Sequence, residues 1–192
     1  SDTPATVDPR RFAAAAVGPG LGRGDEASER LAWALELPLP LVIDADALTI
    51  LGHDVSRRLD ARPGPTVLTP HDGEYRALTG ESPGADRIAA ARDLAAVTGA
   101  VVLLKGGPTV VAAPDGRTRI VVSGDRRLAA AGTGDVLTGA ICGQLAWQGS
   151  PPGPIHEVVA AAAHVHGRAA ASGPDRGFVA SDLLDLLAGA WC

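Results

Sequence analysis

Short apolar runs alternate along the chain with longer segments in which apolar side chains recur at helical spacing. Runs of strand length occupy residues 12–17, 39–43, 66–68 and 100–104, with 110–113 as the hairpin partner of the last run and Asp115-Gly116 as its turn. Helical patterns occupy residues 25–37, 85–97, 135–148, 155–171 and 180–190. Uninterrupted apolar strands between helices are typical of a mostly parallel sheet covered by helices on both faces. We therefore expect an α/β fold.

Length and composition favour one ordered domain. The chain has 192 residues, of which 46% are hydrophobic and 20% charged, enough for one well-buried core but not for two. We therefore treat residues 1–192 as a single domain. The sequence contains no methionine, even at position 1, which predicts an excised or incomplete chain.

Charge and cysteine content restrict the partners and the compartment. A formal net charge of -5 argues against nucleic acid or an anionic membrane surface as the main target. No apolar run reaches membrane-spanning length, and no signal peptide pattern is present. Cys142 and Cys192 provide no disulfide framework, so we expect a reducing, cytoplasmic setting. The apolar helices at the end of the chain favour a homo-oligomer.

The most informative motif is Gly132-Thr133-Gly134, followed at once by Asp135 and an apolar helix. Glycines let the backbone approach a ligand closely, and the N–H groups of a helix start suit an anion. One interpretation is a plain helix start with Thr133 as its cap. The other is an anion hole with Asp135 as a general base. Glycines 139 and 143 favour the second, because they would let this helix pack very close to its neighbours.

A second polar segment, Lys105-Gly106-Gly107-Pro108-Thr109, follows the strand at 100–104. A lysine at a strand end is often only a solvated terminus. Here the two glycines and the threonine form a flexible polar turn that could surround a nucleotide phosphate. The segment is not a P-loop, which requires Gly-Lys-Ser/Thr leading directly into a helix.

Two aspartates, Asp44 and Asp46, follow the strand at 39–43. If the strand persists, their side chains share a face and could hold Mg²⁺ through water or orient a hydroxyl. Alternatively, Asp46 caps a helix that begins near Ala47.

A histidine and a glutamate follow the strand at 66–68. His71 and Glu74 could meet across one turn of a short helix. Capping by Thr69 or Asp72 would explain Glu74 equally well.

Metal-binding and acyl-transfer patterns are missing from the sequence. His164 and His166 are two residues apart on a predicted helix, where their side chains point about 200° apart, so one ion could not bind both. The sequence contains no other His/Cys cluster and no Gly-x-Ser-x-Gly motif. We therefore expect no metal site built from protein side chains.

Taken together, these motifs resemble the ribokinase-like superfamily and, within it, the ADP-dependent NAD(P)H-hydrate dehydratase family. Five segments carry the resemblance: AVGPGLG (16–22), VIDADAL (42–48), LTPHDGEYRALTG (68–80), VVLLKGGPTVVA (101–112) and AGTGDVLTGAICGQLA (131–146). Their order and spacing fit the family over nearly the whole chain. The resemblance implies a ribokinase-like fold and the repair of hydrated NADH or NADPH. ADP would phosphorylate the added hydroxyl, and loss of phosphate would restore the cofactor and release AMP.

The resemblance also implies roles for individual residues. Asp135 would be the catalytic base, and it would contact the substrate together with Gly22, His71 and Asp44. Two segments would hold the adenine nucleotide. The first consists of Lys105, Gly106, Gly107, Pro108 and Thr109, and the second of Gly132, Thr133 and Gly134. Mg²⁺ is expected to offset phosphate charge. A fused or separate NAD(P)H-hydrate epimerase would be a partner.

Several departures from the family keep alternatives open. The family's early strands, which precede its GPGLG segment, are absent here, and so is an Asn-containing turn before GTGD. Arg126 or Arg127 would have to replace that turn as a phosphate contact, and HDGE stands in place of the commoner HPGE. The alternatives are a vitamin-precursor kinase of the same superfamily and a non-catalytic remnant that binds nucleotide.

Overall fold

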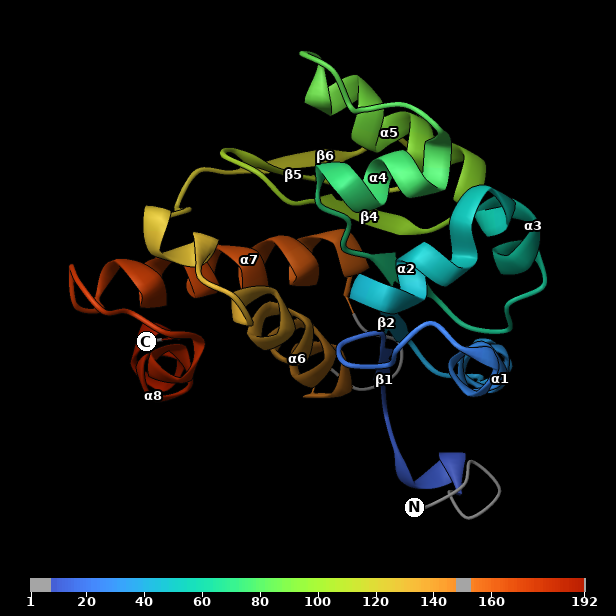
Figure 1. Ribbon diagram of the computed structural model, residues 1–192, viewed down its shortest axis with the longest axis horizontal. Helices are drawn as coiled ribbons and strands as arrows, with labels where there is room; N and C mark the ends of the chain where they lie inside the picture. Colours follow the sequence, from blue (N-terminus) through green and yellow to red (C-terminus); the bar gives the residue numbers. More distant parts are fainter. Residues whose placement is uncertain (1–7, 148–152, 192) are drawn as a thin grey trace.

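A six-stranded sheet forms the centre of the computed structural model, which describes residues 8–147 and 153–191 (Figure 1). The strands lie in chain order: β1 (Ala15–Val17), β2 (Leu41–Ile43), β3 (Thr66–Leu68), β4 (Val101–Leu104), β5 (Thr109–Ala112) and β6 (Thr118–Val121). Strands β1 to β4 run parallel, and the pairs β4–β5 and β5–β6 are antiparallel. The register places Val42 beside Ala16 on one side and Val67 on the other. The expected mostly parallel sheet is confirmed.

The antiparallel end of the sheet extends beyond the prediction. Strands β4 and β5 form the expected hairpin, with Leu104 opposite Val110, but residues 105–108 connect them. The Asp115-Gly116 turn instead leads from β5 to β6. The apolar pattern did not predict β6, because Arg119 and Ile120 are exposed at its centre.

Helices cover both faces of the sheet, as expected. One face carries α1 (Asp25–Leu35), α2 (Ala45–Leu51), α3 (Val55–Asp60), α4 (Asp72–Thr79) and α5 (Arg87–Thr98). The other carries α6 (Thr133–Trp147) and α7 (Ile155–Ala171), and α8 (Ala180–Ala190) packs against both. The 3-10 turns η2 (Pro9–Arg11), η3 (Gly52–Asp54) and η4 (Arg126–Ala129) lie in the connections. No helix in the described ranges is long and apolar enough to cross a membrane.

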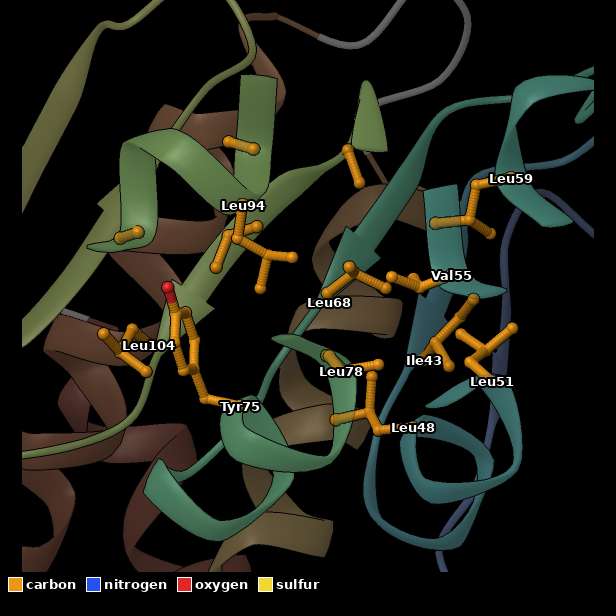
Figure 2. Packing of buried hydrophobic residues seen from close by; sticks show 14 of the residues in the cluster. Ile43, Leu48, Leu51, Val55, Leu59, Leu68, Tyr75, Leu78, Leu94 and Leu104 are labelled. Carbon is orange, nitrogen blue, oxygen red and sulfur yellow. The ribbon is translucent and has the colours of Figure 1, made fainter. Parts of the chain in front are cut away.

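Alternating strand residues supply two separate cores. Ile43 and Leu68 face the first group of helices, where they pack with Leu48 (Figure 2). Val42 and Val67 belong to the cluster on the opposite face, with α6 and α7. Successive strand residues point to opposite faces, so both sets must be apolar when both faces are covered. This arrangement explains the uninterrupted apolar runs in the sequence.

Close backbone approach occurs at glycines other than those that the sequence suggested. Among the described residues, a Cβ on Gly139 or Gly143 would meet no atom of a neighbouring element within 4 Å, so the expected tight packing of α6 at these residues is wrong. A Cβ on Gly18 would lie 1.7 Å from the carbonyl oxygen of Asp44, and one on Gly167 would lie 2.4 Å from that of Ser123. The Gly18 contact brings the loop after β1 against the end of β2.

Candidate functional site

The carboxyl ends of the parallel strands meet at one edge of the sheet, and a buried aspartate lies at its centre. Asp44 follows β2 and is 1% exposed. Its Oδ1 accepts a hydrogen bond from Lys105 Nζ at 2.7 Å, and its Oδ2 accepts one from Thr138 Oγ1 at 2.7 Å. Lys105 Nζ also lies 3.5 Å from Glu74 Oε2. Residues from β2, β4, α4 and α6 therefore converge on one cluster.

The start of α6 faces this cluster. Gly132 precedes the helix in the left-handed region, at φ +85°. A Cβ on Gly134 would lie 3.7 Å from Lys105 Nζ and 4.0 Å from Asp44 Oδ2. The first turn of a helix leaves N–H groups without intrahelical acceptors. We call the backbone of residues 132–134 the cradle. The Thr133 N–H donates to the Ala130 carbonyl at 3.4 Å, so the cradle offers the N–H groups of Gly132 and Gly134 to an anion beside a lysine ammonium.

Thr133 does not cap α6 in the expected way. Its Oγ1 donates hydrogen bonds to the carbonyl oxygens of Leu128, at 2.7 Å, and Ala130, at 2.9 Å. A capping side chain would instead accept a bond from a helix N–H. The hydroxyl thus ties the cradle to η4 and does not occupy the free N–H groups of the helix start.

Asp135 is exposed in the first turn of α6. Within residues 8–147 and 153–191, no side chain forms a hydrogen bond or ion pair with its carboxylate. An exposed carboxylate one residue beyond Gly134 can reach a ligand held at the cradle. This position suits the expected general base.

A buried histidine behind the cradle was not predicted to belong to the site. His166 Nε2 lies 2.9 Å from the carbonyl oxygen of Thr133, and the side chain is buried in α7. Burial lowers the pKa of His166, and the bond to Thr133 opposes that effect. The neutral ring therefore donates Nε2–H to the Thr133 carbonyl. His164 is exposed and His166 is buried, so their side chains lie on different sides of α7.

His71 and Glu74 meet at the start of α4. His71 Nδ1 accepts hydrogen bonds from the N–H groups of Gly73, at 2.9 Å, and Glu74, at 3.1 Å, and Glu74 Oε2 accepts one from His71 N at 2.8 Å. The expected meeting is confirmed, and the N-cap is His71 itself, not Thr69 or Asp72. Nε2 of His71 lies 3.4 Å from Glu74 Oε1, and the His71 side chain is still 59% exposed, so part of the ring can contact a ligand.

Asp44 and Asp46 do not share a face. Strand β2 ends at Ile43, and Ala45 begins α2 with φ +49°. Asp46 accepts hydrogen bonds from Gly22 N, at 3.0 Å, and from the Arg23 Nε, at 2.8 Å. The bond from Arg23 and the bond from Gly22 lower the pKa of Asp46. Asp46 therefore fixes the loop that contains Gly22, and both earlier interpretations, a shared face with Asp44 and a helix cap, are wrong.

Arg87 fixes the loop of residues 105–109 and was also missed. Its Nη1 donates to Asp72 Oδ1 at 2.8 Å, and its Nη2 donates to the Lys105 carbonyl at 2.6 Å. A Cβ on Gly106 would lie 2.5 Å from the same Nη2, so a larger residue there would displace the guanidinium from the Lys105 carbonyl. Thr109 Oγ1 donates to the Gly106 carbonyl at 3.0 Å. An isolated arginine at a helix start carries no sequence signal for this role.

The candidate replacements for the missing Asn turn lie apart from the cluster. Arg127 is bonded to Asp125, to Asp175 and to the carbonyl of Pro174. Arg126 is largely exposed, 3.8 Å from Asp175. These contacts hold η4 to the α7–α8 connection, so Arg127 has little freedom to become a phosphate contact.

A protein-built metal centre is not seen in the described ranges, where no three His, Cys, Asp or Glu residues are grouped to hold an ion. Both oxygens of Asp44 are engaged, which leaves Asp135 as the open carboxylate at the cradle. Mg²⁺ often uses substrate phosphates and water for most of its ligands. The residues therefore fit an ion that enters with a nucleotide.

The chain is similar to known proteins over most of its length. A family described as NAD(P)H-hydrate dehydratase matches residues 2–189. The bifunctional NAD(P)H-hydrate repair enzyme of Mycobacterium tuberculosis is 47% identical over 153 residues, which are 80% of this chain and 32% of that protein. The ADP-dependent (S)-NAD(P)H-hydrate dehydratase of Neisseria meningitidis is 45% identical over 160 residues, 80% of this chain and 53% of that protein. The chain thus spans between a third and about half the length of these relatives.

Solved structures show the same fold. The ADP/ATP-dependent NAD(P)H-hydrate dehydratase of Bacillus subtilis, co-crystallised with ATP and Mg²⁺, superposes with a TM-score of 0.80 at 33% identity, covering 93% of this chain and 64% of that one. A hydroxyethylthiazole kinase from Pyrococcus horikoshii superposes with a TM-score of 0.69 at 20% identity, covering 93% of this chain and 72% of that one. At that identity the second likeness shows the fold alone.

Proposed function

The chain belongs to the NAD(P)H-hydrate dehydratase family, and we propose that it catalyses the ADP-dependent dehydration of hydrated NADH or NADPH. ADP phosphorylates the hydroxyl that hydration added to the nicotinamide ring. Phosphate is then eliminated, which restores the ring and leaves AMP and phosphate as products. We assign this activity to one domain, residues 1–192, although its relatives are longer.

The observation that carries the proposal is the position of the cradle beside Lys105 and Asp135. A helix start with free N–H groups, a lysine ammonium close to Gly134 and an exposed carboxylate next to it are the groups that phosphoryl transfer to a hydroxyl requires. The N–H groups and the ammonium balance phosphate charge. The carboxylate accepts the proton of the attacking hydroxyl.

The remaining residues divide between the two ligands. The nucleotide is held by the cradle and by residues 105–109, which Arg87 fixes. The hydrated nicotinamide contacts the exposed ring of His71 and the loop of Gly22. Asp44 acts on the ligands through Lys105, because both of its oxygens are already bonded. Mg²⁺, held by the nucleotide phosphates and water, would supply further charge neutralisation.

A single assay separates this function from the alternatives. The protein is incubated with hydrated NADPH, Mg²⁺ and ADP, and the absorbance of reduced nicotinamide is followed. We expect recovery that requires ADP. Phosphorylation of a pyrimidine or thiazole alcohol by ATP without any recovery would identify a vitamin-precursor kinase instead. Nucleotide binding without either reaction would identify a non-catalytic remnant.

A further inference from the structure

The Lys105 side chain is held in one place although it lies at a strand end. Its Nζ is 2.7 Å from Asp44 Oδ1, and the side chain is only 22% exposed. Lysine side chains are flexible, and at strand ends they usually extend into water. A fixed, largely covered ammonium at such a position therefore requires an explanation beyond solvation.

Asp44 is the group that fixes the ammonium, and α6 fixes Asp44. A buried carboxylate is unfavourable unless its oxygens are paired, and here Lys105 and Thr138 pair one oxygen each. Thr138 is four residues after Gly134, one turn further along α6. The helix that forms the cradle thus also determines the position of the carboxylate and, through it, the ammonium.

The ammonium retains hydrogen-bonding capacity on the side of the cradle. A lysine ammonium has three N–H donors, one of which is directed at Asp44. Glu74 Oε2, at 3.5 Å, already accepts a bond from His71 N. Lys105 Nζ lies 3.7 Å from where a Cβ on Gly134 would be, and this side is open to an anion bound at the cradle.

We propose that Asp44 and Thr138 are positioning residues, which fix the Lys105 ammonium where it contacts the phosphoryl group in transit. This assignment rests on the proposed function. The substrate hydroxyl oxygen forms a bond to the β-phosphorus of ADP, and its proton moves to Asp135. The bond from that phosphorus to the bridging oxygen breaks, and its electron pair remains on AMP. The ammonium offsets the negative charge on the non-bridging oxygens throughout.

The first test compares two ligands that differ by the transferred group. Calorimetric titration of Lys105→Met with ADP and with AMP, both with Mg²⁺, should show ADP affinity reduced by about 10- to 100-fold and AMP affinity unchanged within about twofold. Equal losses for both ligands, or none for either, would overturn the assignment. If Lys105→Met loses affinity for ADP alone while the wild-type protein restores no NADPH, the Lys105 contact would be supported and the dehydratase function rejected.

The second test isolates the positioning residues. Thr138→Val should lower kcat about 10-fold and should raise the KM for ADP by less than Lys105→Met weakens ADP binding, because the ammonium is displaced but still present. Thr138→Ser keeps the hydroxyl and should restore kcat. Thr98→Val is the matched control, since Thr98 is buried and donates to the Leu94 carbonyl, away from the cluster. A Thr138→Val enzyme with the kcat of Thr98→Val would overturn the positioning role.

Discussion

Two aspartates separated by one residue have different tasks in this protein. Asp44 is buried and holds Lys105, whereas Asp46 holds the backbone of Gly22. The difference arises at Ala45, whose left-handed φ turns the chain from β2 into α2. Alternation along a strand predicted a shared face, because an alanine in the left-handed region leaves no sequence signal. The residue types of the site were therefore predictable, but their directions were not.

The role of Asp135 is tested by removing its charge. Asp135→Asn should lower turnover by about 10²- to 10⁴-fold, because the base is needed only as the hydroxyl attacks. Nucleotide affinity should change little, since the amide preserves the size of the side chain. Steady-state kinetics together with calorimetric titration of ADP would measure both quantities. Near-normal turnover in this variant would show that another group removes the proton.

We expect His166 to fix the cradle through the hydrogen bond that its Nε2–H donates to the Thr133 carbonyl. His166→Leu leaves the Thr133 carbonyl without this donor, and should lower the free energy of unfolding by about 1–3 kcal/mol and weaken ADP binding. His166→Gln retains an N–H donor and should preserve ADP affinity better. Urea denaturation and ADP titration would measure the two effects, with the exposed His164→Leu as control. Equal ADP affinity in the Leu and Gln variants would argue against a role in fixing the cradle.

At the scale of elements, helix α6 shows what periodicity can and cannot determine. The start of α6 was predicted within two residues, and residue 148, where its predicted range ends, lies outside the described residues. The bounds of α7 and α8 were predicted correctly. Its packing was predicted wrongly, since Gly139 and Gly143 face open space. Two glycines four residues apart in a helix can mark a close contact with another helix, but they also occur where no such contact exists. Only the positions of the neighbouring elements distinguish the two cases.

The contrast between open and crowded helical glycines predicts opposite changes in stability. Gly143→Ala should raise the free energy of unfolding by about 0.5–1 kcal/mol, because alanine is the better helix former and its Cβ meets nothing. Gly167→Ala should lower it by more than about 1 kcal/mol, because its Cβ would overlap the Ser123 carbonyl. Chemical denaturation of both variants would test this. A destabilised Gly143→Ala protein would indicate that α6 has a neighbour on that side.

At the scale of the molecule, the sheet and its layers follow from the sequence, and the assembly of the site follows only in part. The motifs that follow β1, β2, β3 and β4 meet at one edge of the sheet, because these strands run parallel. The bonds that join those motifs were not predictable. Thr138 lies within the motif at 131–146, but its residue type does not indicate a bond to Asp44, and Arg87 acts through the backbone carbonyl of Lys105.

The buried histidine also predicts how stability depends on pH. The lowered pKa of His166 means that the native state binds fewer protons than the unfolded state. Its contribution to stability is therefore present above the unfolded value of about 6.5 and is lost as the pH falls towards the native pKa. Urea denaturation at pH 7.5 and 5.5 should show a smaller decrease in His166→Gln than in the wild type. Identical decreases would mean that His166 titrates equally in both states.

The bonds of Asp44 also have a consequence for the order of events during synthesis. Its partners Lys105 and Thr138 follow it by 61 and 94 residues. A nascent chain that has emerged from the ribosome only through β3 would have to bury the Asp44 carboxylate without Lys105 or Thr138, which is unfavourable. The segment from β1 to β3 should therefore not reach its native fold on the ribosome until α6 has been translated. The contacts of Asp44 with Lys105 and Thr138, which are distant in sequence, should form late in folding.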